Sequence, residues 1–361
     1  MGEGRRFRFR RRWFLWVLLP VAVIALGRWL MPHEEVRALV IEEITRATGA
    51  EVILGESSVR FLPGLGVRLD GGSIVGTGAA LEAATGSPSK IDHYEIRLDG
   101  FDVDLALGPL LTGRVRVTSI EAHGPVMAFA WAGEEVRLEG FALALKDVGV
   151  TVESARAAVE RAAGNVPPGE VIPPDLVFDL EARVDRVTAQ KALYEGLEMG
   201  GDFAGRILTV PTFSVHRGGG LLSGNFAVDY ASDSHGRFSF EAAAEAVPAE
   251  VLLAPWAPDV AGRLDGPLDV QASGDFAMRD QATVLRTLKV EGRASGGPGV
   301  LRAEDWLREA TPFLGNRQDL KNIDFKSVSH AFRLVDGRYH VDSLEFRGGQ
   351  TDWRGAGWLD L

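Results

Sequence analysis

The stretch FDVDLAL, residues 101–107, alternates apolar and acidic side chains along its length. An extended chain turns successive side chains to opposite faces, so one face of this stretch is apolar and the other carries Asp102 and Asp104. The apolar members are Phe101, Val103, Leu105 and Leu107. A period of two indicates a β-strand that is buried on one face and solvated on the other.

The same alternation recurs along most of the chain after residue 50. It predicts further strands, whose apolar side chains are Phe141, Leu143, Leu145, Leu176, Phe178, Leu180, Phe226, Val228, Leu268, Val270, Phe332 and Leu334. Asp and Gly between these stretches predict turns at 70–72, 99–100, 265–266 and 336–337. The fold class that follows is mainly β, a meandering antiparallel sheet with one apolar face and a few short helices.

Helical periodicity is confined to short segments. Pro32 can begin a helix with one apolar face, and Gly49 is its expected stop. Further short helices are expected near residues 153–163, 248–256 and 302–314. The segment GNVPPGEVIPPD, residues 164–175, contains four Pro and two Gly, which predicts a linker or a long crossing loop. It divides the rest into an N-terminal β domain with its capping helix at 32–163 and a C-terminal β region at 176–361.

Residues 1–31 predict a membrane anchor behind an Arg-rich tail. Six arginines between residues 5 and 12 precede an uncharged run from Trp13 to Gly27, and Arg28 can lie at the interface. The aromatic residues that suit the two interfaces are Trp13, Trp16 and Trp29. The arginines favour a cytoplasmic N-terminus, with the bulk of the chain across the membrane. A cleaved signal peptide shares this order, but the run ends in GRWLMPHEE, without the small residues of a cleavage site.

Composition excludes several classes of protein. The chain has 361 residues, 46% of them hydrophobic, which indicates a folded protein with a sizeable core. It has no cysteine, so thiol catalysis, Cys-ligated zinc and disulfides are excluded. The net charge is −11, and the excess of acids is larger after residue 31, where 32 basic residues face 49 acidic ones. Nucleic acid is therefore not an expected partner.

Motifs of catalysis and cofactor binding do not occur in the sequence. It contains no Walker A sequence, no HExxH and no GxSxG, and Gly218-Gly219-Gly220 is more typical of a turn between strands than of an anion site. Asp99, Asp102 and Asp104 could be imagined as calcium ligands, but alternate acids on a strand are typical of its solvated face. We therefore expect no catalytic residues, no cofactor and no metal site.

Three segments resemble the AsmA family. VILGESSVRFLPGLGVRLDGGSIVG at 52–76 and LALGPLLTGRVRVTSIEAHGPVM at 105–127 match the family's N-terminal strands and turns, and the final segment, residues 328–361, matches its C-terminal region. The matching motif residues are Pro63, Gly64, Leu65 and Gly66, then Pro109, Leu110, Leu111 and Gly113, then Gly124 and Pro125, and finally Gly355, Gly357, Leu359, Asp360 and Leu361.

This resemblance implies an elongated, curled antiparallel sheet, a β-groove in the periplasm anchored to the inner membrane. Such a groove is similar to those of TamB and of bridge-like lipid transfer proteins. The resemblance implies phospholipids as partners, and the apolar residues named above would line the groove. Alternation by itself favours the core of a β-sandwich, so the open groove depends on the resemblance. About 22 strands spaced ~4.8 Å apart would extend at most about 105 Å.

Family members commonly continue beyond the final motif, which here leaves the last strand as an edge for self-association or an envelope protein partner. The alternative function is therefore an envelope assembly or scaffolding factor that acts through this edge.

Overall fold

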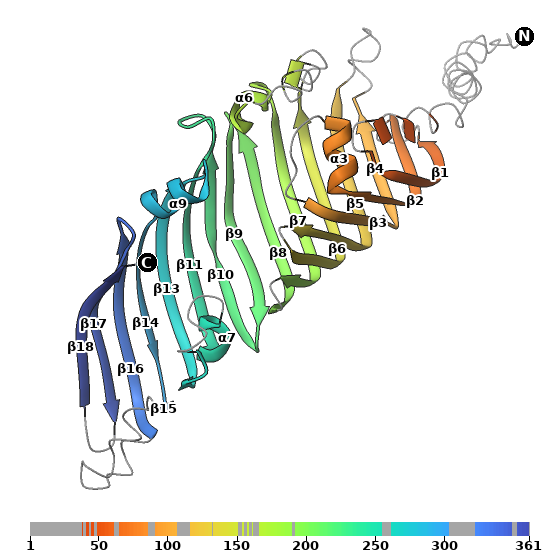
Figure 1. Ribbon diagram of the computed structural model, residues 1–361. Coiled ribbons are helices and arrows are strands. Elements are labelled where there is room, and N and C mark those ends of the chain that lie inside the picture. The colour runs from red at the N-terminus through yellow and green to blue at the C-terminus, as the bar shows by residue number, and fades with distance from the viewer. Residues whose placement is uncertain are drawn as a thin grey trace, which may run out of the picture.

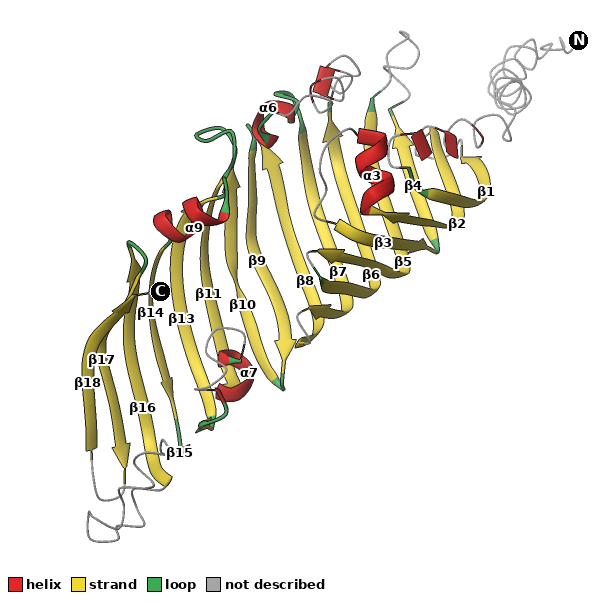
Figure 2. Ribbon diagram, in the orientation of Figure 1, coloured by secondary structure: helices red, strands yellow, loops and turns green. Residues whose placement is uncertain are grey.

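The described residues form a single antiparallel sheet of eighteen strands (Figure 1). The computed structural model describes residues 49–60, 65–85, 91–106, 116–131, 133–150, 166–189, 192–254, 261–302, 322–348 and 352–360, with helical positions at 38, 41–42, 45–46, 154, 157–158 and 161. Its short helices lie near the ends of the strands (Figure 2). The predicted class, mainly β with a large antiparallel sheet and few short helices, is confirmed.

The strands of the first half are β1 (Glu51–Arg60), β2 (Leu65–Thr77), β3 (Ile91–Leu98), β4 (Gly100–Leu105), β5 (Val117–Trp131), β6 (Glu134–Gly149), β7 (Val177–Ala189), β8 (Ala192–Ala204) and β9 (Ile207–Arg217). Those of the second half are β10 (Gly220–Asp229), β11 (Arg237–Pro248), β12 (Leu264–Asp265), β13 (Pro267–Ala277), β14 (Lys289–Gly296), β15 (Gly299–Arg302), β16 (Asn322–Val335), β17 (Arg338–Gly348) and β18 (Asp352–Asp360). The helices are α3 (Gly78–Thr85), α6 (Pro168–Val171), α7 (Ala249–Leu253) and α9 (Gln281–Thr287).

Strands that follow one another in sequence pair with one another. β3 and β4 both pair with β2 and β5, and β14 and β15 both pair with β16. Each of these couples therefore occupies one position in the order of strands across the sheet, and we call such a position a rung. β12 and β13 likewise pair with β15 and β14. The eighteen strands thus form fifteen successive rungs. At ~4.8 Å per rung the sheet is about 67 Å long, and the expected extent of about 105 Å is too large for the described residues.

The sheet continues without a break across the Pro-rich segment at 164–175. β6 and β7, which flank it, pair directly from Val136 with Ala189 to Gly149 with Val177. The described part of the segment contains α6 and a turn, and the Gly169 amide donates to the Ser234 carbonyl at 2.7 Å. The segment therefore connects two neighbouring antiparallel strands of one sheet.

Only one of the four predicted Asp-Gly turns reverses the chain. Asp336 and Gly337, both with positive φ, join β16 to β17. Residues 70–72 lie inside β2, Asp99 separates β3 from β4, and Gly266 separates β12 from β13; the chain continues in the same direction at each. The prediction of turns at these three places was wrong, because the Gly and Asp there kink the strand without reversing it; the pairing register is the same before and after 70–72 and 99–100.

A line of such irregular positions crosses the N-terminal half of the sheet. Gly71, Gly140 and Gly196 have φ values of +82°, +64° and +63° on β2, β6 and β8. On β6 the apolar positions change from odd to even numbers at Gly140, from Leu143 to Leu138. A residue with positive φ re-aims the side chains that follow it, so the apolar residues before and after the line share one face. The strands of this half are bent (Figure 1).

Helices outside the sheet agree in part with the sequence. The described residues between 38 and 46 are helical, and Gly49, with φ +65°, donates its amide to the Thr45 carbonyl at 2.7 Å, as expected of a helix stop. α7 lies where a helix was expected, whereas α3, α6 and α9 were not predicted and 303–314 lies outside the described residues. None of the helices in the described part is long and apolar enough to cross a membrane.

α7 covers one end of the apolar face in the C-terminal half. Ala249 is fully buried there in a cluster with Leu264, Leu268, Phe325 and Val328. The Ala249 amide donates to the Gly266 carbonyl at 2.9 Å, which fixes the start of the helix to the gap between β12 and β13. A closed core therefore exists at this margin, while the rest of the face has no second sheet over it among the described residues.

Gly124 gives a test of the close approach between neighbouring strands. A Cβ at Gly124 would lie 2.1 Å from the Arg97 carbonyl oxygen, so we expect Gly124→Ala to lower the free energy of unfolding by about 2–4 kcal/mol in urea denaturation. Gly357→Ala is the matched control, because a Cβ there meets nothing within 4 Å, and its effect should stay within about 0.5 kcal/mol. Equal effects of the two variants would show that the Gly124 backbone does not lie as close to the Arg97 carbonyl as described.

Candidate functional site

The cross-strand register places the predicted apolar residues on one face of the sheet. Directly paired residues of antiparallel strands point to the same side, so a chain of pairs defines a row. One row runs across eleven rungs through Phe101, Ala122, Leu143, Ala182, Met199, Phe213, Gly224, Ala242, Ala272, Gly292 and Phe332. Three predicted residues from strands far apart in sequence thus lie in one line.

The remaining predicted residues occupy neighbouring rows of this face. Val103, Leu145 and Leu180 are joined through Ile120, and Phe226 is joined to Leu334 through Phe240, Gly274 and Val290. The other direct pairs are Leu105 with Leu65, Phe141 with Val184, Phe178 with Phe203, Val228 with Phe238, Leu268 with Gly296 and Val270 with Ala294. We call this surface the apolar face.

Some predicted residues are not on these rows. Leu176 precedes β7, and its amide donates to the Pro173 carbonyl at 3.2 Å, so its assignment to a strand was wrong. Leu107 and the anchor tryptophans Trp13, Trp16 and Trp29 lie outside the described residues.

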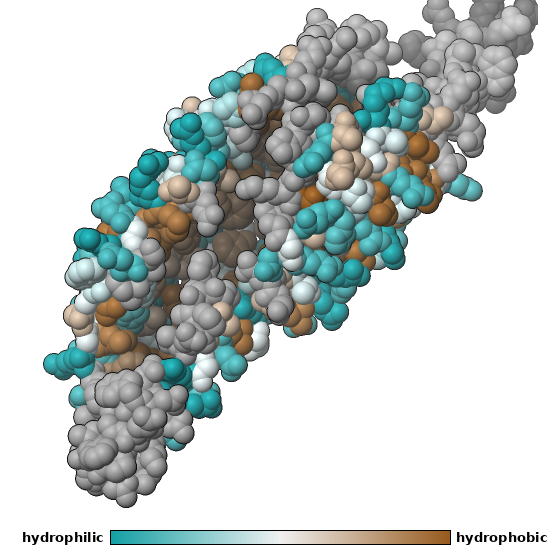
Figure 3. Space-filling view, viewed as in Figure 1, coloured by the Kyte–Doolittle hydropathy of each residue, from teal (hydrophilic) through white to brown (hydrophobic). Residues whose placement is uncertain are grey.

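The apolar face is hollowed along the sheet. Figure 3 shows hydrophobic side chains in the depth of the molecule, between polar groups that follow both margins. Only one sheet contributes to it in the described part of the chain, so the two facing sheets of a sandwich are not formed there. Leu143 keeps 37% of its surface exposed although it lies in the middle of the long row. An apolar surface of this kind is a place for an apolar ligand.

Aromatic rings and glycines alternate in a regular way on this face. Five rings lie opposite a glycine of the neighbouring strand; the pairs are Tyr94 with Gly76, Phe213 with Gly224, Phe240 with Gly274, Phe332 with Gly292 and Phe325 with Gly299. A Cβ at each of these glycines would come within 3.0 Å of the ring. The missing side chains let the rings lie over the backbone, which lowers the floor of the hollow.

Phenylalanines also form a continuous series across β9 to β13. The ring centroids of Phe226 and Phe238 are 5.5 Å apart, and those of Phe238 and Phe276 are 5.1 Å apart. Beside this series, Gly224, Ala242, Ala272 and Gly292 succeed one another in the long row. The result is a furrow of small residues with an aromatic side, which presents carbon atoms and no charge over four rungs.

Two polar side chains lie on the apolar face near its C-terminal end. His330 Nδ1 donates to the Ser343 carbonyl at 2.9 Å, since a carbonyl can only accept, and its Nε2 lies 2.6 Å from the Tyr339 hydroxyl. The Phe332 ring stacks on both, with centroids at 5.4 Å and 5.6 Å. Burial raises the pKa of Tyr339 to about 12. The two side chains satisfy each other's polar groups across two strands, and no sequence motif marks the pair.

The opposite face of the sheet is charged. Arg68 of β2 bonds Asp102 of the neighbouring strand β4 at 2.8 Å, and Arg60 of β1 bonds Asp104 of β4 at 2.6 Å across β2, which lies between them. Asp102 and Asp104 therefore lie on the solvated face, as the alternation predicted. The hydrogen bond to Asp102 raises the pKa of Arg68. In the described part of the chain no group of three His, Asp or Glu side chains is arranged to hold a metal ion.

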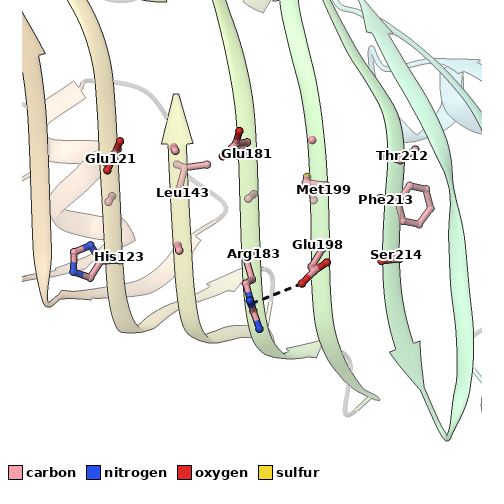
Figure 4. A pocket seen from close by; sticks show the side chains of 15 residues that line it. Glu121, His123, Leu143, Glu181, Arg183, Glu198, Met199, Thr212, Phe213 and Ser214 are labelled. Carbon is pink, nitrogen blue, oxygen red and sulfur yellow. Dashed lines mark ion pairs between the residues drawn. The ribbon is translucent and has the colours of Figure 1, made fainter. Parts of the chain in front are cut away.

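This polar face carries a shallow hollow of about 590 Å³ over β5 to β9 (Figure 4). Glu121, Glu181 and Glu198 border it, and the Arg183 guanidinium approaches Glu198 at 3.9 Å. Both members of this ion pair are more than 60% exposed, so it contributes little to stability. The hollow has no buried polar group that would bind a ligand, and we do not assign it a function.

Comparisons with known proteins identify no relative. No protein-family model matches the chain, and neither the curated proteins nor the solved structures contain a match. The site must therefore be interpreted from its own geometry.

Tyr339 gives a test of the environment at the C-terminal end of the apolar face. In an ultraviolet titration of the native protein its phenol should ionise near pH 12, and Tyr339→Phe should remove that transition. The folded pKa lies above the unfolded value of about 10, so this phenol contributes stability that is fully present below pH ~10 and is lost as the pH rises toward 12. Ionisation of Tyr339 at pH ~10 in the folded chain would contradict its burial.

Proposed function

We propose that this chain is an AsmA-like protein that binds phospholipids on its apolar face and helps transfer them toward the outer membrane of a bacterial envelope. The single observation that supports this most is the long apolar row, which no second sheet covers among the described residues. The Arg-rich, apolar N-terminal segment supports an inner-membrane anchor with the sheet in the periplasm. In this proposal the hollow is an open, curled β-groove, and the residues of the apolar face are its lining.

The physical basis of binding is the removal of acyl chains from water. At about 0.8 kcal/mol per CH₂, a lipid with about thirty methylenes gains a gross free energy on the order of 20 kcal/mol on the apolar face. The bilayer that supplies the lipid offers a similar gain, so movement between bilayer and groove is close to balanced. Along the groove, an acyl chain that leaves one rung meets a similar apolar surface on the next rung, which favours sliding.

The dimensions limit the mechanism. Fifteen rungs extend about 67 Å, roughly twice the ~30 Å hydrocarbon thickness of one bilayer. A single copy of this length fits a partial conduit, a shuttle or one unit of an oligomer better than a complete bridge between two membranes.

Leu143 gives the direct test of this function, because it is partly exposed on the apolar face and Ala142, its neighbour in β6, is exposed on the polar face. Lipid bound to full-length protein purified in mild detergent would be extracted and quantified by mass spectrometry. Leu143→Asp should lower the bound phospholipid about tenfold, since a carboxylate among acyl chains is strongly disfavoured.

Ala142→Asp, which adds the same charge on the other face, should leave the bound phospholipid within about twofold of the parent. Absence of phospholipid from the parent protein in repeated preparations, or equal losses in both variants, would contradict the proposal. Circular dichroism of both variants shows that the sheet is intact.

A second candidate function, scaffolding through the edge of the sheet, is favoured by β18. This strand pairs with β17 alone among the described strands, and Trp358 on it is 61% exposed. Unpaired backbone groups on such a strand can pair with another chain.

Ala356→Pro tests the edge, because Pro removes an amide donor from β18. If the edge carries self-association, the parent should show concentration-dependent oligomers in analytical ultracentrifugation and Ala356→Pro should remain monomeric with unchanged lipid content. Monomeric parent protein at all concentrations would contradict self-association through β18.

A further inference from the structure

Arg217, the last residue of β9, is buried on the apolar face. Only 8% of its surface is exposed, and it is the one charged residue among the buried side chains of the described chain. It pairs with Gly220 across the tight β9–β10 hairpin, whose Gly218 and Gly219 have φ values of +59° and +86°. Its position on this face follows from Val215, two residues earlier, which pairs with Leu222.

The partner of Arg217 is a hydroxyl and not a carboxylate. Its Nη1 donates to the Tyr194 hydroxyl at 2.9 Å, and the guanidinium carbon lies 4.8 Å from the centre of the Tyr194 ring. The salt bridges of the described residues do not include Arg217. A buried guanidinium without a counter-ion is costly, since its charge is removed from water without compensation.

The donors that Tyr194 does not use remain accessible. The Arg217 nitrogens are not among the fully buried side-chain atoms that lack a hydrogen-bond partner, so those without a bond in the described structure still reach solvent. The Tyr194 hydroxyl accepts from Arg217 and can donate its own proton onward. Together they present several N–H donors and one O–H donor to a single anionic oxygen group.

The surroundings connect this donor group to the apolar face. Tyr194 pairs with Val187, which pairs with Leu138, and Leu138 pairs with Met127, so an apolar row leads away from it across β7, β6 and β5. Among the paired residues of the described strands, the register places no other Arg or Lys on this face. Basic residues that form cross-strand ion pairs, such as Arg68 and Lys146, are on the polar face. A single positive charge therefore stands at the margin of the apolar face.

We propose that Arg217 and Tyr194 form an anion subsite that binds the phosphate of a phospholipid whose acyl chains lie on the adjoining apolar rows. Arginine suits this role because its planar fork binds phosphate oxygens with two parallel hydrogen bonds. The subsite rests on the proposed lipid-binding function and adds to it a fixed position for the headgroup and a preference for lipids with a phosphate. It lies beside α7, since a Cβ at Gly218 would be 3.0 Å from Val251.

The test compares two lipids that share the same acyl chains. Full-length protein in mild detergent is equilibrated with phosphatidylglycerol or with diacylglycerol, and bound lipid is measured by mass spectrometry over a concentration series. Arg217→Gln should weaken phosphatidylglycerol binding about tenfold and leave diacylglycerol binding within about twofold. Tyr194→Phe keeps the ring and should weaken phosphatidylglycerol alone by about threefold, and it carries the test if Arg217→Gln does not fold.

Controls separate the headgroup contact from structural roles. Arg183→Gln, on the polar face, should change neither affinity, and Arg217→Lys should retain part of the preference for phosphatidylglycerol. Equal losses for both lipids in Arg217→Gln would assign Arg217 to the support of the hairpin and overturn the subsite. Displacement of phosphatidylglycerol by excess inorganic phosphate, with no discrimination between the two lipids, would assign the site to free phosphate. Failure of the parent to bind either lipid would instead contradict the proposed function.

Discussion

An apolar sheet face that lacks a covering layer is the constraint on which the structure depends. A sheet normally hides such a face against helices or a second sheet, because exposed apolar area is unfavourable in water. In the described residues α7 and its cluster around Ala249 give such cover at one margin. Bending of the sheet reduces the remaining exposure, and the rings that lie over glycines reduce it further. The same bending leaves the apolar face hollowed along the sheet.

Backbone conformation at a few glycines explains how the apolar side chains of fifteen rungs stay on one face of the sheet. Positive φ at Gly140 and Gly196 shifts the side-chain phase where the strands bend, so apolar residues on both sides of the bend remain together. On the polar face, cross-strand ion pairs such as Arg68 with Asp102 keep that surface solvated. The two faces thus differ along the whole sheet, and only the apolar one offers a continuous path.

Much of the fold was accessible from the sequence, because a period of two survives in almost every strand. Phe101, Leu143 and Phe332 were assigned to one apolar face from alternation alone, and the register places them in one row. The kinks at 70–72 and 99–100 were mistaken for turns, since Asp-Gly is compatible with both and only the pairing partner decides. Leu176 was misplaced because three residues after Pro173 complete a turn before β7 begins.

The polar groups of the apolar face could not be found from the sequence. His330 and Tyr339 meet across β16 and β17, and Arg217 meets Tyr194 across β9 and β8. Each contact depends on a register that is set by bulges, and a one-residue change in register would separate the partners. Whether the apolar series covers an open hollow or a closed core is equally a matter of tertiary arrangement.

Photo-crosslinking in living cells tests the central claim most directly. A photoreactive amino acid would replace Leu143, Phe226 or Phe332 on the apolar face, or the adjacent Ala142, Asn225 or Arg333 on the polar face. If lipids travel along the apolar face, phosphate-labelled lipid should attach at all three apolar positions and at none of the polar ones. Lipid attached equally to both faces, or to neither, would contradict lipid transfer along this face.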